Sequence, residues 1–123
     1  MSRSTPRNAA VWFEIPVTDM ERAKAFYRTV LEVELKDENM GPNPMAIFPA
    51  MENGVAGHLY PGKPAGSGEG NTIHLASPDP LEKALERVTA NGGEVISDIV
   101  TIPAGRFAYC LDPDGNSIGL FGG

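Results

Sequence analysis

The sequence has one cysteine, Cys110, so no disulfide can form within the chain. It has no apolar run as long as a membrane-spanning helix, and its first residues include no apolar segment typical of a secretion signal. Basic residues are few, since 10 Lys and Arg stand against 16 Asp and Glu, which gives a net charge of −6. These absences predict a cytoplasmic protein that binds neither nucleic acid nor a membrane surface.

What the chain does have is the composition of one globular domain. Its 123 residues suffice for a single hydrophobic core, and 41% of them are hydrophobic while 21% are charged. The 14 glycines and 11 prolines indicate tight connections between short elements. We therefore predict one domain that spans residues 1–123.

The chain contains two versions of one pattern. In residues 11–27 and again in residues 72–88, a strand-like run ends at an aspartate that opens an amphipathic helix. These aspartates are Asp19 and Asp79, which are 60 residues apart. The ends of the two halves also share glycine, leucine and aromatic positions, in G-V-A-G-H-L-Y-P-G and G-N-S-I-G-L-F-G-G. The repeat predicts two modules related by a pseudo-two-fold axis, covering about residues 9–60 and 71–121.

Each module is predicted to be β-α-β-β-β, which makes the fold class α+β. In the first strand, Phe13 and Ile15 share an apolar face, whereas Trp12 and Glu14 lie on the other face. Asp19 suits the N-cap of the following helix. Residues 61–70 have the only linker-like composition in the chain. The remaining strands are predicted at residues 33–36, 46–49, 55–60, 71–76, 94–99, 106–111 and 116–121.

Three of these motifs together resemble the vicinal oxygen chelate superfamily. They are a strand that ends in V-x-D, the helix start E-R-A-x-x-F-Y and the final D-P-D-G-N-x-I. The superfamily includes glyoxalase I, extradiol dioxygenases, fosfomycin-resistance transferases and bleomycin-resistance proteins. The resemblance covers residues 11–121 and implies that the sheets form a half-open barrel, with the helices outside and the site on the concave face. It also implies a homodimer.

The resemblance places the usual metal ligands at positions that here hold Trp12, Thr72, Gly119 and His58. Tryptophan and glycine side chains offer no lone pair to a divalent ion, and threonine is a poor ligand. Only His58 could bind a metal. We therefore expect no metal or other cofactor at the usual site, and no ordinary glyoxalase I activity.

A metal site at other positions remains a second hypothesis. Glu14 and His74 stand at equivalent positions, each five residues before its aspartate, so pseudo-symmetry predicts that they meet in the cavity. Together with His58 they would supply two histidines and one carboxylate, which is a known ligand set for iron. The alternative is that Glu14 and His74 only hydrogen-bond each other, with His58 at the rim.

Two classes of function remain. The first is a metal-free protein that binds a small, partly planar and not strongly anionic molecule, with Trp12, Glu14, His58, His74 and Phe121 as the predicted binding residues. The second is a lyase, isomerase or dioxygenase-type enzyme. It would use either a divalent metal at Glu14, His58 and His74 or Glu14 as a general base. The sequence assigns no catalytic residue.

Overall fold

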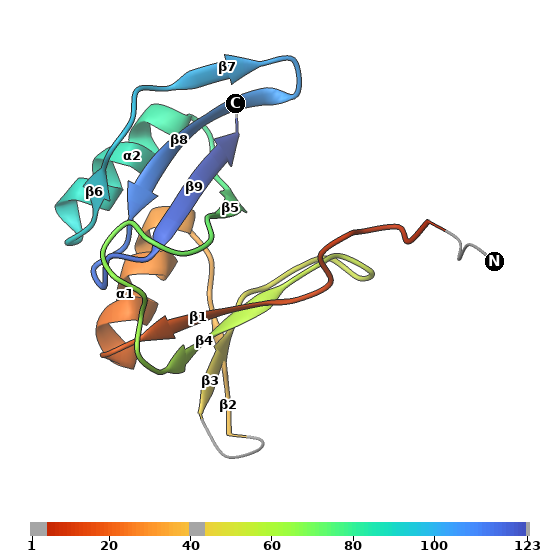
Figure 1. Cartoon of the computed structure of the whole chain (residues 1–123), viewed down its shortest axis with the longest axis vertical. Coiled ribbons are helices and arrows are strands. Elements are labelled where there is room, and N and C mark those ends of the chain that lie inside the picture. Colours follow the sequence, from red (N-terminus) through yellow and green to blue (C-terminus); the bar gives the residue numbers. More distant parts are fainter. Residues whose placement is uncertain (1–4, 40–43, 123) are drawn as a thin grey trace.

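The computed structural model describes residues 5–39 and 44–122, and folds them into two open β-sheets with two helices (Figure 1). The first sheet has the strand order β1-β4-β3-β2 and belongs to the first module. Its elements are β1 (Phe13–Val17), α1 (Met20–Leu31), β2 (Lys36–Glu38), β3 (Met45–Ile47) and β4 (Gly57–Pro61).

The second sheet has the order β5-β9-β8-β6, and β7 pairs with β8 beside this path. Its module consists of β5 (Ile73–Ala76), α2 (Leu81–Ala90), β6 (Glu94–Val95), β7 (Val100–Ile102), β8 (Gly105–Leu111) and β9 (Ser117–Gly122). In each module the first strand pairs in parallel with the last, β1 with β4 and β5 with β9. The predicted α+β fold of two similar modules is confirmed.

Two strands lie at other residues than the sequence predicted. The strand expected at residues 33–36 lies at Lys36–Glu38. The strand expected at residues 94–99 is divided, because β6 pairs with the end of β8 and β7 pairs with its beginning. Between the two, the Ser97 hydroxyl accepts the backbone N–H of Tyr109 at 2.8 Å. A side chain thus interrupts the ladder there, which a hydrophobicity pattern does not reveal.

Local sequence explains where α1 begins and ends. The Asp19 carboxylate accepts a hydrogen bond from the Arg22 backbone N–H at 3.1 Å, as predicted for an N-cap. The helix ends at Glu32, which has left-handed backbone angles with φ of 55°. Helix α2 has no side-chain cap bond at Pro80, and the chain turns after it at Gly92, where φ is 91°. Glycine adopts that conformation without a steric penalty.

The core lies between the sheets and the two helices, which also contact each other. The apolar face of β1 is buried as predicted, with Ile15 and Val17 almost inaccessible and Phe13 packed against the core. The opposite face of the strand stays available for a site. This side-to-side alternation is what places Trp12 and Glu14 away from the core.

The turn before β9 connects the modules. Asp112 is 3% exposed and accepts the Tyr27 hydroxyl at 2.6 Å from α1. Asn116 donates from its amide to the Pro16 carbonyl oxygen at 2.8 Å. Asp114 pairs with Arg22 of α1 at 2.8 Å, which adds an ion pair to the contact between the modules. These bonds hold the turn before β9 against α1 and the end of β1, near which the candidate site lies.

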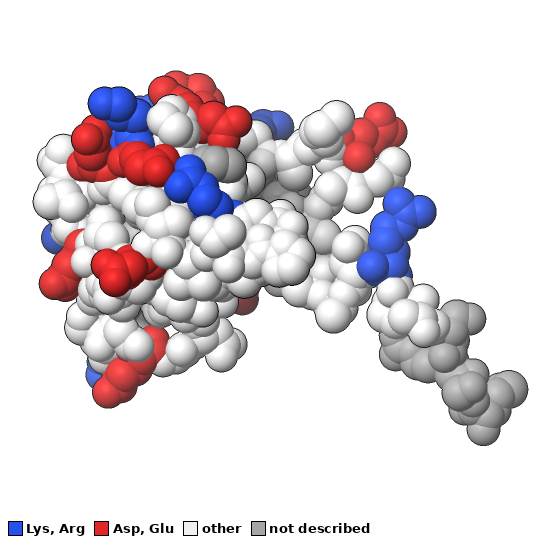
Figure 2. All heavy atoms as spheres, turned by 90° about the horizontal axis from the view of Figure 1, so that it is seen from above, with Lys and Arg blue, Asp and Glu red and all other residues white. Residues whose placement is uncertain are grey.

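Within the described residues, no helix is long and apolar enough to cross a membrane. On the face shown in Figure 2, acidic and basic side chains are interspersed, and that face shows no broad basic area. The surface seen there lacks the concentrated positive charge that nucleic-acid binding requires.

Candidate functional site

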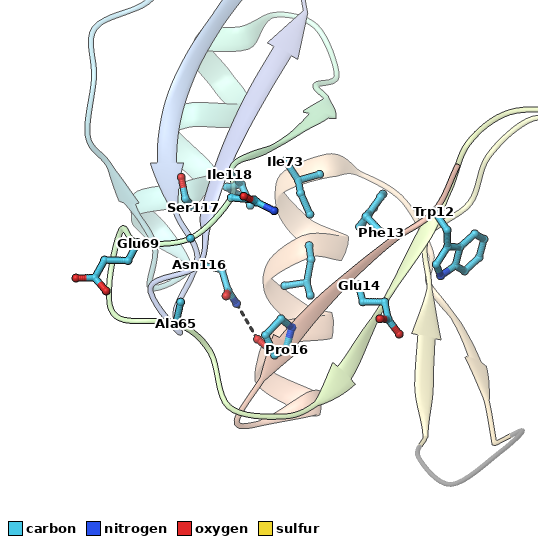
Figure 3. A pocket seen from close by; sticks show the side chains of 13 residues that line it. Trp12, Phe13, Glu14, Pro16, Ala65, Glu69, Ile73, Asn116, Ser117 and Ile118 are labelled. Atoms are coloured by element: carbon cyan, nitrogen blue, oxygen red, sulfur yellow. Dashed lines mark hydrogen bonds between the residues drawn. The ribbon is translucent and has the colours of Figure 1, made fainter. Parts of the chain in front are cut away.

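Three side chains lie in a row on the face of the first sheet that points away from the core, joined by one hydrogen bond and one close polar contact. The indole N–H of Trp12 donates to Nδ1 of His58 at 2.9 Å. The other imidazole nitrogen, Nε2, lies 3.2 Å from Oε1 of Glu14. Figure 3 shows Trp12 and Glu14 on the same side of the first strand.

The strand register explains why these residues meet. Glu14 of β1 is the direct partner of His58 in the parallel β4 strand, so both side chains leave the sheet on the same face. Trp12 is two residues before Glu14 and shares that face. The adjacent Tyr60 ring lies edge-on to the His58 ring, with the two ring centroids 6.0 Å apart.

The hydrogen bonds determine the tautomer of His58. An indole N–H can only donate, so Nδ1 of His58 must accept and carries no proton. In the neutral imidazole the proton is then on Nε2, where it can be donated to Glu14. Both ring nitrogens of His58 are therefore occupied by protein groups.

The three residues differ in their access to solvent. His58 is buried at 7% exposure, whereas the Glu14 side chain is 62% exposed and Trp12 is 46% exposed. His58 therefore lies behind the other two and orients them. Glu14 and Trp12 are the groups that a ligand can touch.

A cavity of about 380 Å³ lies beside Glu14 and Trp12, between β1, the residues after β4 and the start of β9 (Figure 3). We call it the linker cavity. It is lined by Trp12, Phe13, Glu14, Ile15, Pro16, Ala65, Glu69, Gly70, Asn71, Ile73, Asn116, Ser117 and Ile118. Both modules contribute, and its volume is in the range of small-molecule sites.

A second cavity of about 380 Å³ lies between Trp12 and His74, and also touches Thr72. Trp12, Phe13 and Ile73 line both cavities. The two spaces therefore share the junction between β1 and β5, the first strands of the modules.

His74 belongs to an aromatic cluster on the second sheet. Its ring contacts Phe107 with centroids 5.3 Å apart, Tyr109 at 5.7 Å and Phe121 at 6.4 Å. Phe107 and Phe121 are stacked with an angle of 6° between their planes. The His74 ring lies over Gly119, its register partner in β9, where a Cβ atom would collide with the ring.

The predicted contact between Glu14 and His74 is absent from the described part of the chain, and this expectation was wrong. Glu14 pairs with His58 because β4 is its hydrogen-bonded neighbour in the same sheet. His74 instead lies in β5, at the edge of the other sheet, and turns toward its own aromatic neighbours. Glu14, His58 and His74 do not come together as a three-residue group that could hold a metal ion, and the described residues contain no other such group.

The positions that the resemblance assigns to metal ligands do not fit a metal either. The indole of Trp12 is bonded to His58, and the hydroxyl of Thr72 is bonded to Ser117. At Gly119 the His74 ring fills the space in which a ligating side chain would begin. The donors that a divalent ion needs are thus missing or already engaged.

The structure places the five predicted binding residues in two groups. Trp12, Glu14 and His58 form the polar chain on the first sheet, while His74 and Phe121 belong to the aromatic cluster. Sequence analysis missed the remaining members of that cluster, Phe107 and Tyr109. Their spacing by two residues in a predicted strand was the signal that could have revealed them.

Comparisons with known proteins agree with this architecture. The family model described as the Glyoxalase/Bleomycin resistance protein/Dioxygenase superfamily matches residues 9–120. A structure of a glyoxalase/bleomycin resistance protein from Albidiferax ferrireducens has a TM-score of 0.70 and 22% identity, over 94% of this chain and 100% of that one. A fosfomycin resistance protein from Listeria monocytogenes has a TM-score of 0.69 and 18% identity, over 97% and 93% of the two chains.

Among curated proteins, the chain is similar to one from Mycobacterium tuberculosis named "Putative glyoxylase CFP32" and to its namesake in Mycobacterium bovis. Each is 29% identical over 117 residues, which cover 89% of this chain. The chain spans only 44% of the length of these relatives.

Proposed function

The chain belongs to the glyoxalase/bleomycin resistance protein/dioxygenase superfamily, and from this premise we propose that it binds a small molecule in the linker cavity without a metal ion. The observation that carries the proposal is the Trp12–His58–Glu14 chain, of which Trp12 and Glu14 line this cavity. Trp12 supplies a planar ring and Glu14 a carboxylate at the border of this cavity. Apolar contact together with a few placed polar groups is what small-molecule recognition requires.

Trp12 provides the test, because it is the only tryptophan in the sequence. A fragment that enters the linker cavity should change the fluorescence of Trp12, and ligand-observed NMR should show weaker binding of the same fragment to Trp12→Phe. We expect fragments that contain a planar ring to bind, and Glu14→Gln to alter their affinity. If no fragment binds in a way that depends on Trp12 or Glu14, the proposal is wrong.

The proposed lack of a metal has its own test. Protein purified without a histidine tag should contain no stoichiometric metal, and Fe²⁺, Mn²⁺ or Zn²⁺ should not raise its melting temperature. A rise that His58→Ala abolishes would instead support the metal-dependent alternative and contradict this part of the proposal.

A second candidate function is a metal-free lyase or isomerase with Glu14 as general base. The observation that favours it is that Oε1 of Glu14 lies 3.2 Å from Nε2 of His58, while Oε2 has no hydrogen-bond partner among the described residues. An oriented carboxylate of this kind can take a proton from a bound oxygenated metabolite. Mass spectrometry of ligands after incubation tests this, and Glu14→Gln should stop conversion while binding remains measurable. A dioxygenase would need metal donors that the site does not offer.

We also propose that the protein is a cytoplasmic homodimer. Apolar side chains are exposed before β1 and before β4, two segments that run together away from the body in Figure 1. Val11 is 74% exposed, Met51 is 89% exposed and Val55 is 40% exposed. A second copy that covers these residues would remove apolar surface from water.

A further inference from the structure

We propose that the linker cavity selects a planar ligand that carries a protonated amine. This inference rests on the proposed function, because it names the class of molecule that the same cavity would bind. It starts from the charges of the cavity wall. Two of the lining residues, Glu14 and Glu69, are acidic, and the lining includes no lysine, arginine or histidine.

Glu14 is the acid that a ligand can reach. Its Oε1 faces His58, and its Oε2 has no hydrogen-bond partner in the described part of the protein. Because His58 in the tautomer described above is neutral, no described lysine or arginine balances the Glu14 charge. A carboxylate oxygen only accepts hydrogen bonds, so its partner must be a donor.

The other polar groups of the cavity also leave acceptors free. The amide nitrogen of Asn116 donates to the Pro16 carbonyl and to Asp112, which leaves its carbonyl oxygen without a donor among the described residues. The Ser117 hydroxyl is engaged with Thr72. The amide of Asn71, also in the lining, can donate as well as accept. Apart from Asn71, these polar side chains offer acceptors, so a ligand that donates hydrogen bonds complements them better than one that accepts them.

A positive charge on the donor adds to this preference. Hydrogen bonds between two charged groups are roughly twice as strong as neutral ones. The Glu69 carboxylate points away from Glu14 in Figure 3, so it makes the local potential more negative without occupying the same contact. The exposed ring of Trp12 attracts both a flat apolar group and a nearby cation.

Three probes with the same ring and different head groups test the inference: 2-phenylethylammonium, 2-phenylethanol and 3-phenylpropionate. They would be titrated into the full chain at neutral pH and low salt, with Trp12 fluorescence as the readout. The ammonium should bind about tenfold more tightly than the alcohol, and the carboxylate should bind most weakly.

Two variants make the test specific. Glu14→Gln should bring the ratio of ammonium to alcohol affinity close to one. Glu86→Gln removes the same charge from an exposed acid on α2 that pairs with Lys83, and should leave this ratio unchanged. An equal effect of both variants would assign the preference to net charge and overturn the inference.

The outcomes separate this inference from the proposed function. If the ammonium and the alcohol bind equally well, the cavity binds small molecules but the proposed ligand class is wrong. A different result would contradict both the ligand class and the proposed site. In that result, none of the three probes changes the fluorescence of Trp12, and Glu14→Gln alters the affinity of none of them.

Discussion

The hydroxyl group of Tyr27 in α1 donates a 2.6 Å hydrogen bond to Asp112, which is 85 residues away in the turn before β9. Asp112 also accepts the backbone N–H groups of Asp114 and Asn116, both at 2.9 Å. One buried carboxylate thus organises the turn and joins it to the helix of the other module. Since Asn116 in this turn also bonds to Pro16, the contact helps define the linker cavity.

Removal of this bond should weaken the whole fold. Tyr27→Phe takes away a buried donor to a carboxylate, and we expect it to lower the free energy of unfolding by about 1–3 kcal/mol. Urea unfolding followed by circular dichroism measures the change. Tyr109→Phe is the matched control, because Tyr109 is 36% exposed and no described residue bonds to its hydroxyl. Its effect should be within about 0.5 kcal/mol, and equal effects of the two variants would contradict the prediction.

The same hydroxyl should make stability depend on alkaline pH. Burial, followed by the negative charge of Asp112, raises the pKa of Tyr27 well above its usual value of 10.0. The folded state holds the Tyr27 proton more tightly than the unfolded chain does. The stability that the protonated hydroxyl contributes is therefore complete below the Tyr27 pKa of the unfolded chain. It is lost as pH rises from there through the folded pKa. Wild type should therefore lose stability relative to Tyr27→Phe above about pH 10, and parallel pH profiles would refute this.

Trp12 should control the tautomer of His58. In wild type the imidazole should be protonated at Nε2, since the indole donates to Nδ1 at 2.9 Å. Trp12→Phe keeps an aromatic ring but removes the N–H, so the Nδ1–H form should become populated. The ¹⁵N chemical shifts of the ring distinguish the two tautomers. Tyr60→Phe is the control, because it keeps the ring beside His58 and should leave the tautomer unchanged.

Assembly is tested by light scattering. We expect a mass near twice the 13.1 kDa of one chain at tens of micromolar. Met51→Glu places a charge among the exposed apolar side chains before β4 and should lower the mass, whereas Glu86→Gln on α2 should not. A monomer mass for wild type under these conditions would contradict the proposed homodimer.

The sequence alone determined the features that depend on neighbouring residues. Alternation in the first strand predicted that Ile15 would face the core and that Trp12 and Glu14 would not. Asp19 marked the start of α1 because an N-cap acts within one helical turn. The internal repeat indicated two modules, and the family motifs indicated how they fold. Each of these signals is carried by residues a few positions apart or by a direct copy of the same pattern.

Only the tertiary structure decided which distant side chains meet. Pseudo-symmetry suggested that Glu14 would face His74, but the parallel pairing of β1 with β4 gives Glu14 a nearer partner, His58. His74 turns across Gly119 toward Phe107, because a residue without a side chain leaves room for the ring. Such choices depend on strand register and on the space left by neighbours from other segments. The spacing of residues along the chain encodes neither of these directly.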